Sequence, residues 1–311
     1  MAVNLEKSVL VYDVGGSHVS TAACFAEGYR LGPVVTGHHH DCRNAEDFVG
    51  LLHSLGERAT TGAAGVLGAG LAMPGPFDYA TGVSWMRHKL SYLYGIDLRE
   101  ALAKRFGWQP RQVHFVNDAA AFLLGEIGAG AARGVPRAVG ITLGTGIGSA
   151  FAVDDRIVTG GSGVPGGGEI WNLPFKDRTV EDFLSTRAIQ QAYRERTGRD
   201  CEVSDIAANA DDDPAAIEVF TEFGCNLGLA LCNLLSQFAP DVVVLGGGIS
   251  RSAPLFLSVA ERQLGGFKVE LRVSTLGDYA PLVGAAVALF ASSTGFAPVK
   301  DGEAAQLKSA D

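Results

Sequence analysis

A glycine turn that begins with a carboxylate is the first feature of the sequence that could do chemistry. The segment DVGGS, residues 13–17, comes at the end of a short apolar, β-branched segment, residues 8–13, that is typical of a buried strand. A carboxylate at a strand end can hold Mg²⁺, directly or through water, and glycine lets the backbone approach phosphate oxygens closely. We therefore expect Asp13 to bind Mg²⁺, although an ordinary tight turn would use the same glycines. The expected phosphate contacts are Gly15, Gly16 and Ser17.

A second glycine turn after an apolar segment occurs further along the chain. The segment LGTGIG, residues 143–148, again places glycines after an apolar run, and Thr145 adds a hydroxyl that can donate to a phosphate. A third glycine turn, residues 246–248, follows the strand-like segment 241–245 and could offer a surface without side chains to a nucleoside. Each turn also has a structural explanation, as a tight β-turn or as a strand-to-helix connection. The expected nucleotide contacts are Gly144, Thr145, Gly146, Gly247 and Gly248.

Asn117 and Asp118 stand between a short apolar segment, residues 113–116, and an alanine-rich segment, residues 119–130, that favours a helix. An aspartate at the end of a buried strand is a candidate general base, which removes the proton from an attacking hydroxyl group. Asparagine and aspartate are also preferred helix N-caps. One pair of residues can serve both purposes.

The predicted elements repeat. A strand meander followed by helix, strand and helix starts near residue 8 and again near residue 138, which predicts a duplicated α/β fold of two lobes with an interdomain cleft. A single helix is expected over Val180–Thr197. The expected boundaries are an N-terminal lobe of residues 1–118 completed by a C-terminal helix at 281–296, a second lobe of residues 119–280, and a flexible tail of residues 297–311.

Composition excludes several classes of protein. The 311 residues are 47% hydrophobic and carry a net charge of −9 without a dense basic run, so we expect no nucleic-acid partner. The five cysteines are scattered and form no CxxC pair, which argues against disulfides and zinc. We see neither a signal-like start nor an apolar stretch close to the roughly 20 residues of a membrane helix. The expected location is the cytoplasm.

Six motifs follow one another between residues 9 and 289: DVGGS, PGPFD, FVNDAA, ITLGTGIGSA, GGGEIWN and LGGGIS. In this order they resemble the motifs of the ROK family (repressors, open reading frames, kinases). The resemblance implies an actin-like, ribonuclease H-like fold and an ATP- and Mg²⁺-dependent hexose kinase, glucokinase-like and commonly a homodimer. It also implies that Asp118 is the catalytic base for a sugar hydroxyl, the 6-hydroxyl being expected. The residues that would bind the sugar are Gly75, His88, Asn117, Asp118, Glu169, Asn172 and Glu181.

Two departures from the family pattern concern the segment after Glu169. Asn172 stands where the family often has a histidine, and the cysteine cluster that binds a structural zinc in many members is missing. We therefore expect a zinc-independent branch, in which Asn172 can exchange hydrogen bonds with sugar hydroxyls but carries no charge. Trp171 could stack on a sugar or simply pack. The run His38–His40 alternates between strand faces and so does not suit one metal ion.

Three other functions compete with an ATP-dependent kinase. A sugar-sensing transcriptional regulator of the same family would carry a helix-turn-helix domain, whereas only about seven residues precede the first strand. A sugar-binding protein without catalysis would fit the loss of the histidine, and a polyphosphate-dependent kinase would share the same motifs. The sugar itself stays open among glucose, mannose, fructose, allose and N-acetylhexosamines.

Overall fold

The computed structural model describes residues 7–61 and 65–293, which form two compact α/β units. The first unit runs to Gly130 and resumes at Tyr279, and the second is the continuous segment Ala131–Asp278. The boundary expected at Asp118 differs from this division, because helix α3 (Asp118–Ala129) packs within the first unit. The tail expected at residues 297–311 lies outside the described residues.

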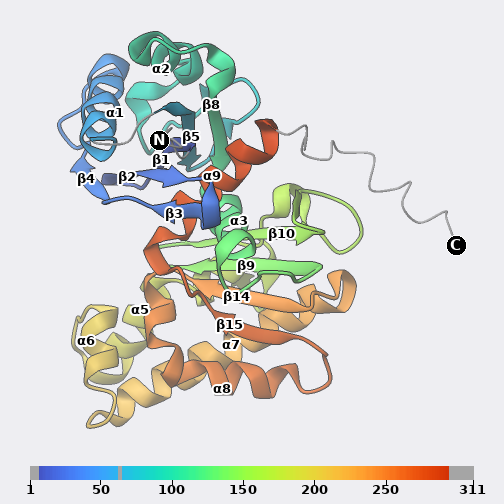
Figure 1. Ribbon diagram of the computed structural model, residues 1–311. Coiled ribbons are helices and arrows are strands. Elements are labelled where there is room, and N and C mark those ends of the chain that lie inside the picture. Colours follow the sequence, from blue (N-terminus) through green and yellow to red (C-terminus); the bar gives the residue numbers. More distant parts are fainter. Residues whose placement is uncertain (1–6, 62–64, 294–311) are drawn as a thin grey trace, which may run out of the picture. The chain divides into compact units, whose positions relative to one another are not determined.

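The first unit is built on a six-stranded sheet whose central strand is β1. Strand β1 pairs antiparallel with β2 and parallel with β5, and β5 in turn pairs parallel with β8 (Figure 1). Its side chains are buried on both faces, as expected for a strand with helices on either side. The strands are β1 (Ser8–Val14), β2 (His18–Phe25), β3 (Arg30–Leu31), β4 (Val35–His38), β5 (Val66–Met73) and β8 (Val113–Asn117).

Helices α1 (Ala45–Ala59) and α2 (Leu98–Phe106) cover one face of this sheet. Each begins at a capping side chain that the sequence supplies: Asn44 accepts from Asp47 N at 2.9 Å, and Asp97 accepts from Glu100 N at 3.0 Å. The hairpin of β6 (Phe77–Asp78) and β7 (Val83–Ser84) lies in the connection between β5 and α2. Three 3₁₀ helices complete the unit: Glu27–Tyr29, Ser91–Leu93 and Pro110–Gln112.

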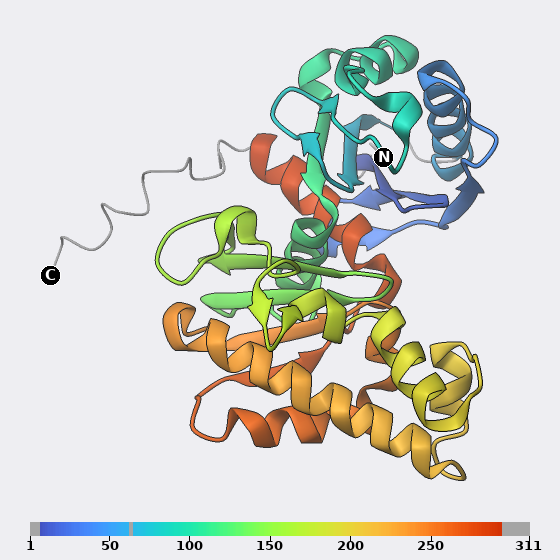
Figure 2. The same cartoon turned by 180° about the vertical axis from the view of Figure 1, so that it is seen from behind.

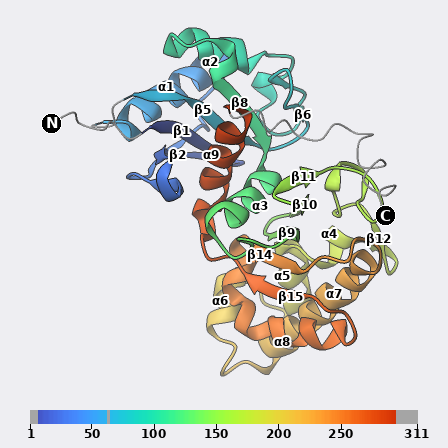
Figure 3. The ribbon, with the colours of Figure 1, turned by 45° about the vertical axis from the view of Figure 1, so that its right-hand side comes forward.

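The last helix of the chain, α9 (Ala280–Ser293), covers the other face and lies beside α3 (Figure 3). The two helices approach closely because glycines stand at their contact. A Cβ atom on Gly284 would overlap the carbonyl oxygen of Ala121, and one on Gly125 would overlap that of Ala280. Only glycine fits at both positions, since close-packed interiors do not give way to an added methyl group.

The second unit repeats the architecture of the first. Its sheet has the order β11-β10-β9-β14-β15, in which β9 pairs antiparallel with β10 and parallel with β14. The first sheet has the matching order β3-β2-β1-β5-β8, so the predicted duplicated α/β fold is confirmed. The strands are β9 (Arg137–Leu143), β10 (Ile147–Val153), β11 (Arg156–Val158), β14 (Val242–Gly246) and β15 (Glu270–Val273).

The helices of the second unit pack their apolar sides into one core with this sheet. Helix α7 is the long yellow-to-orange helix in Figure 2, and it packs against α8 and α5. A hairpin of β12 (Pro174–Phe175) and β13 (Arg178–Thr179) precedes α4. The helices are α4 (Val180–Phe183), α5 (Thr186–Thr197), α6 (Val203–Ala208), α7 (Pro214–Phe238) and α8 (Ala253–Leu264). The 3₁₀ segments are Gly166–Gly168, Gly248–Ser252 and Gly277–Tyr279, the last of which lies at the division between the units.

The single helix predicted over Val180–Thr197 is wrong. Helix α4 ends after one turn, and Leu184 and Ser185 leave the helical conformation before α5 begins at Thr186. Both residues at the break are buried, and the N–H of Thr186 donates outside the helix, to Gly144 O at 2.7 Å. The pattern of apolar residues continues through the break, which is why periodicity alone did not show it.

Helix α7 has 25 residues and is long and apolar enough to cross a membrane, contrary to the expectation of no such stretch. More than half of its most apolar part is buried in the unit, where Phe220, Phe223 and Leu227 belong to the core. A core helix that is surrounded by protein has the same composition as a membrane helix. The burial accounts for the composition of α7.

Candidate functional site

The predicted residues of the first unit gather at one edge of its sheet. Strands β1, β5 and β8 are parallel, with Asp13 beside Ala72 and Met73 beside Asn117 in the register. Their carboxyl ends therefore bring three segments to the same edge: the DVGGS turn, the Pro-Gly loop after β5, and Asn117 with Asp118. Ligands of open α/β sheets bind outside this edge.

The turn after β1 is tight, and the side chain of a buried histidine, His39, contacts it. Gly15 N donates to His18 O at 2.9 Å, which closes the turn between β1 and β2. Nε2 of His39 lies 3.0 Å from Gly15 O, and its Nδ1 lies 3.3 Å from the hydroxyl of Tyr92. His38 and His40 are exposed while His39 is buried, which confirms the alternation predicted for this run. The sequence did not reveal that His39 supports the turn.

Gly16 is a glycine that the fold itself does not require. A Cβ atom there would meet nothing within 4 Å, and its φ lies outside the left-handed region. A glycine without a packing or conformational reason fits a position where a ligand approaches the main chain. Asp13 lies at the adjoining end of β1, partly exposed, and a carboxylate oxygen is the ligand type that Mg²⁺ prefers.

Asn117 uses its whole side-chain amide within the protein. Its oxygen caps α3 by accepting from Ala119 N at 3.0 Å and Ala120 N at 3.1 Å. Its nitrogen donates to Tyr79 Oη at 3.2 Å and to Asp118 Oδ1 at 3.0 Å. An amide has two donors and two acceptor positions, so all four are engaged. This geometry favours a role in orienting Asp118, and the predicted contact between Asn117 and the sugar stays a prediction.

Asp118 is exposed, and its carboxylate is fixed at one oxygen. Oδ1 accepts from Asn117 and from Ala119 N, the latter at 2.9 Å. Although the residue is exposed, the surrounding protein atoms reduce the hydration of the ionised form and so raise the pKa of the carboxyl group. The hydrogen bonds and the charge of Lys89 act in the opposite direction but do not cancel this effect.

The remaining predicted residues of this unit are Gly75, in the Pro-Gly loop, and His88, which follows β7. Gly75 lies near the hydroxyl of Tyr79, which donates to Met73 O at 3.2 Å and accepts from Asn117. Tyr79 thus links the loop to Asn117, a connection that the sequence did not suggest. His88 is exposed and precedes Lys89, the residue whose charge acts on Asp118.

The second unit shows a parallel arrangement at its own sheet edge. Strands β9 and β14 are parallel, with Gly246 beside Thr142, so the LGTGIG turn and the glycines after β14 lie at the same edge. Gly144 N donates to Gly146 O at 3.0 Å, and Thr145 is exposed at the tip. A Cβ atom on Gly144 would meet only Gly146 O, at 3.9 Å. Like Gly16, Gly144 has no packing reason to be glycine.

Three other glycines of this unit differ in how closely neighbouring atoms would approach an added Cβ atom. Gly247 has φ +81°, and a Cβ atom there would overlap the backbone of Leu143, so the fold requires glycine at this position. A Cβ atom on Gly146 would lie 2.6 Å from Oε2 of Glu181. Gly248 has no neighbour within 4 Å of the corresponding position. Of the three, Gly248 is the one whose backbone is not crowded by other protein atoms, so a ligand could approach it.

Glu169, Trp171 and Asn172 form an exposed group on the loop after β11. The indole Nε1 of Trp171 donates to Oε2 of Glu169 at 2.8 Å, so the ring that could stack on a sugar also orients a predicted sugar-binding carboxylate. The loop is tied to β10 through Ser149, whose Oγ donates to Gly168 O at 2.6 Å and accepts from Ile170 N at 3.1 Å.

Between Asn172 and Glu181, the β12–β13 hairpin occupies the segment where the family often carries its cysteines. Phe175 packs edge-on against Phe183, and Nζ of Lys176 donates to Oδ1 of the buried Asn226 at 2.7 Å. Across residues 7–61 and 65–293, no three His, Cys, Asp or Glu side chains are grouped so as to hold a metal ion. Aromatic packing and this hydrogen bond are contacts that stabilise the hairpin.

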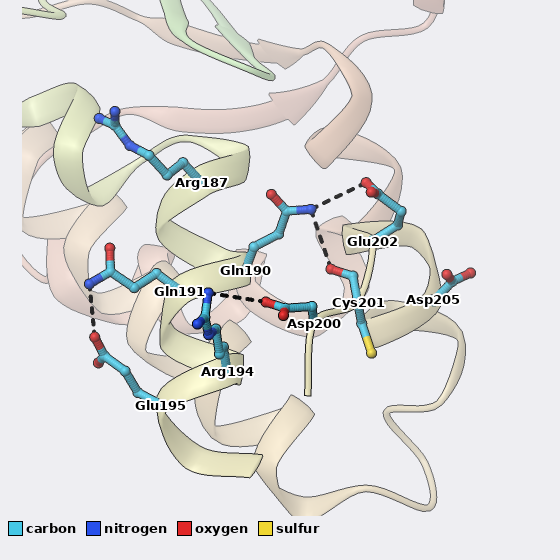
Figure 4. A pocket seen from close by; sticks show the side chains of 9 residues that line it. All are labelled: Arg187, Gln190, Gln191, Arg194, Glu195, Asp200, Cys201, Glu202 and Asp205. Carbon is cyan, nitrogen blue, oxygen red and sulfur yellow. Dashed lines mark hydrogen bonds and ion pairs between the residues drawn. The ribbon is translucent and has the colours of Figure 1, made fainter. Parts of the chain in front are cut away.

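A groove of about 830 Å³ lies in the second unit between α5 and the segment that leads into α6 (Figure 4). Its polar side chains bond to one another: Arg194 pairs with Asp200 at 3.5 Å, and Gln190 donates to Glu202 at 3.2 Å. None of the predicted site residues lines it. The lining residues are Arg187, Gln190, Gln191, Arg194, Glu195, Asp200, Cys201, Glu202 and Asp205.

The two α/β units share the same strand order, and each carries a glycine turn at the carboxyl edge of its sheet. This is the architecture of the actin-like ATPases. The chain belongs to the ROK family, whose model matches residues 11–292. The family resemblance predicted from the motifs is thereby confirmed.

Individual relatives agree with this assignment. The chain is 29% identical to the N-acetyl-D-glucosamine kinase of Aliivibrio salmonicida over 212 residues, which cover 62% of this chain and 69% of that kinase. The structure of a ROK hexokinase from Thermus thermophilus is 26% identical, with a TM-score of 0.78 over 93% of this chain and 99% of that one. A ROK glucokinase from Streptomyces griseus, in complex with glucose and AMPPNP, is 22% identical, with a TM-score of 0.74 over 90% of this chain and 98% of that one.

Proposed function

We propose that this protein is a sugar kinase that transfers the γ-phosphoryl group of ATP to a hydroxyl group of a hexose or an N-acetylhexosamine. The observation that carries the proposal is the fixed carboxylate of Asp118, at the junction of β8 and α3, in a chain of the ROK family. Relatives named as N-acetylglucosamine kinase, hexokinase and glucokinase support the reaction class and both kinds of acceptor.

Asp118 is the general base of the proposed mechanism. The hydrogen bonds from Asn117 and Ala119 N both reach Oδ1, so we assign Oδ2 as the oxygen that accepts the proton of the attacking hydroxyl, expected to be the 6-hydroxyl. The raised pKa improves the carboxylate as a base, because a catalytic base works best when its pKa approaches the pH of the reaction. Asn117 keeps this geometry through its bonds to Tyr79 and Ala119.

The glycine turns are the proposed phosphate sites. The backbone at Gly16 and Gly144 is open to a ligand, and Thr145 adds an exposed hydroxyl that can donate to a phosphate oxygen. Asp13, at the end of β1, would hold Mg²⁺ directly or through water. When bound, the ion would neutralise charge on the phosphate oxygens.

A coupled assay of ADP release tests the proposed function. The purified protein is mixed with Mg²⁺-ATP and a panel of glucose, mannose, fructose, allose and N-acetylhexosamines, and then with polyphosphate as the alternative donor. ADP release with one or two sugars supports the proposal and identifies the substrate. Turnover with polyphosphate alone would assign a different donor, and sugar binding without turnover on any donor would make the protein a sugar-binding member of the family.

Substitution of the open glycines should separate nucleotide binding from folding. We expect Gly16→Ala and Gly144→Ala to leave the thermal unfolding midpoint at or above that of the wild type, because the added methyl group meets no protein atom closer than 3.9 Å. The KM for ATP should rise roughly 10-fold or more, since a methyl group in a close contact typically costs 1–3 kcal/mol. Calorimetric unfolding and initial rates at varied ATP measure the two effects.

Gly247→Ala is the matched control for these two variants. It should lower the unfolding midpoint, because its φ of +81° and the backbone of Leu143 exclude a side chain. Wild-type KM values for ATP in both Gly16→Ala and Gly144→Ala would contradict the assignment of phosphate to these turns.

A further inference from the structure

The LGTGIG turn of the second unit is held by two hydrogen bonds from one neighbouring segment. Oε2 of Glu181, in α4, accepts from Ile147 N at 3.1 Å, just after the turn. The N–H of Thr186, the first residue of α5, donates to Gly144 O at 2.7 Å, at the start of the turn. The two bonds fix both ends of the turn.

The break between α4 and α5 makes this arrangement possible. The first N–H groups of a helix have no partner inside that helix, so beginning a new helix at Thr186 provides a donor for Gly144. A continuous helix would have used the same N–H internally. Helix α4 is itself held in place, because Thr179 and Asp182 form a capping box and Glu181 N donates to Trp171 O at 3.1 Å.

Gly146 leaves room for the carboxylate of Glu181. A Cβ atom on Gly146 would lie 2.6 Å from Oε2 of Glu181, closer than carbon and oxygen approach without a shift of one of them. No neighbour forces a comparable restriction on Gly144, two residues earlier. Gly146 and Glu181 therefore form a matched pair, in which the missing side chain makes room for the carboxylate.

We infer that Glu181 is a positioning residue for the phosphate-binding turn, and that its effect falls on the nucleotide. This inference rests on the proposed function, in which the turn at Gly144 and Thr145 holds phosphate. By accepting from Ile147 N, the carboxylate fixes the first residue of β10, directly after the turn. The family resemblance assigned Glu181 to the sugar, so the two roles predict different kinetic effects.

The test compares Glu181→Ala and Glu181→Gln with the wild type. The dissociation constant of Mg²⁺-AMPPNP is measured by titration calorimetry without sugar, and the KM values for ATP and for the sugar are measured separately. In Glu181→Ala we expect nucleotide binding to weaken about 10-fold or more, as for the loss of a charge-assisted hydrogen bond. The KM for the sugar should change by less than about 3-fold, near the smallest effect expected of one hydrogen bond. Glu181→Gln should stay within about 3-fold of the wild type for the nucleotide, because its amide oxygen still accepts from Ile147 N.

Glu195→Ala is the matched control, since Glu195 is an exposed glutamate of α5 that accepts from Gln191, away from the turn. Should Glu181→Ala fail to fold, Gly146→Ala provides a second route, because its methyl group displaces the same carboxylate. It should weaken nucleotide binding in the otherwise wild-type protein. Where Glu181→Ala does fold, the effect of Gly146→Ala in that background should be smaller.

Unchanged nucleotide affinity in Glu181→Ala, with a raised KM for the sugar, would overturn the inference and assign the residue to sugar binding. This outcome is distinct from failure of the proposed function. A wild-type protein that binds AMPPNP but phosphorylates no sugar would reject the kinase activity while the effect of Glu181 on nucleotide binding is still measured.

Discussion

Asp118→Asn should lower the turnover number by roughly 10²–10⁴-fold, the range that positioned acid–base groups contribute. The asparagine oxygen can still accept from Ala119 N, so the local structure is preserved, but the amide cannot take a proton at neutral pH. Nucleotide binding should be unchanged, because the glycine turns assigned to the phosphates are untouched. The coupled ADP assay gives the turnover number, and calorimetric titration with AMPPNP gives the affinity.

Asp97→Asn is the control for this substitution. Asp97 caps α2 by accepting from Glu100 N, and asparagine caps helices equally well, so its activity and stability should match the wild type. Turnover close to that of the wild type in Asp118→Asn, with Asp97→Asn also unaffected, would reject Asp118 as the base.

The pH dependence of the reaction provides an independent signature of Asp118. The base must be ionised, so kcat/KM for the sugar should fall as the pH falls through the pKa of this carboxyl group. Because the pKa is raised, the decline should begin at a higher pH than for an ordinary aspartate. The residual activity of Asp118→Asn should lack this acid limb. A profile in the wild type that stays flat down to the ordinary range of aspartate would contradict the assignment.

Gly284→Ala should be the most destabilising of the alanine substitutions considered. The added methyl group would overlap the carbonyl oxygen of Ala121, and helices α9 and α3 would have to separate to admit it. Overpacking of a core typically costs 1–3 kcal/mol and occasionally more, and here the obstacle is backbone rather than a flexible side chain. The thermal unfolding midpoint and the protease sensitivity of the first unit measure the loss.

Gly50→Ala is the matched control, with an effect of the opposite sign. Gly50 lies inside helix α1, and a Cβ atom there would meet nothing within 4 Å. Alanine is favoured over glycine in a helix by about 1 kcal/mol, so this variant should be more stable than the wild type. Equal midpoints for the two variants would show that α9 and α3 do not pack at Gly284 as described.

The sequence predicted those parts of the fold that depend on short-range signals. Asn117 caps α3, as the preference of its residue type indicated, and the repeat of strand meander and helix corresponds to two sheets of the same order. The break at Leu184 and Ser185 was missed because it is stabilised by a distant partner, Gly144, that no local pattern reveals. The division of the units after α3 was not predicted for the same reason, since the contact of α3 with α9 joins segments far apart in the sequence.

For the candidate site, residue types and motif order located the positions but not their partners. Asp118 stood out as a carboxylate at a strand end, yet its orientation depends on Asn117 and on Tyr79, which carried no signal of its own. Likewise, the glycines of the turns looked equivalent in sequence. Only the structure separates Gly16 and Gly144, which are open to a ligand, from Gly247, which the fold requires.

The place of α9 has a consequence for the order in which the protein matures during translation. Strand β1 is synthesised before the second unit, but the apolar face formed by Val9 and Val11 is covered by Leu282 and Ala285, which are made after that unit. The second unit, Ala131–Asp278, is continuous and has its whole core available before α9 is translated. The first unit is therefore completed after the second, and the nascent chain carries an uncovered apolar face until α9 has been made.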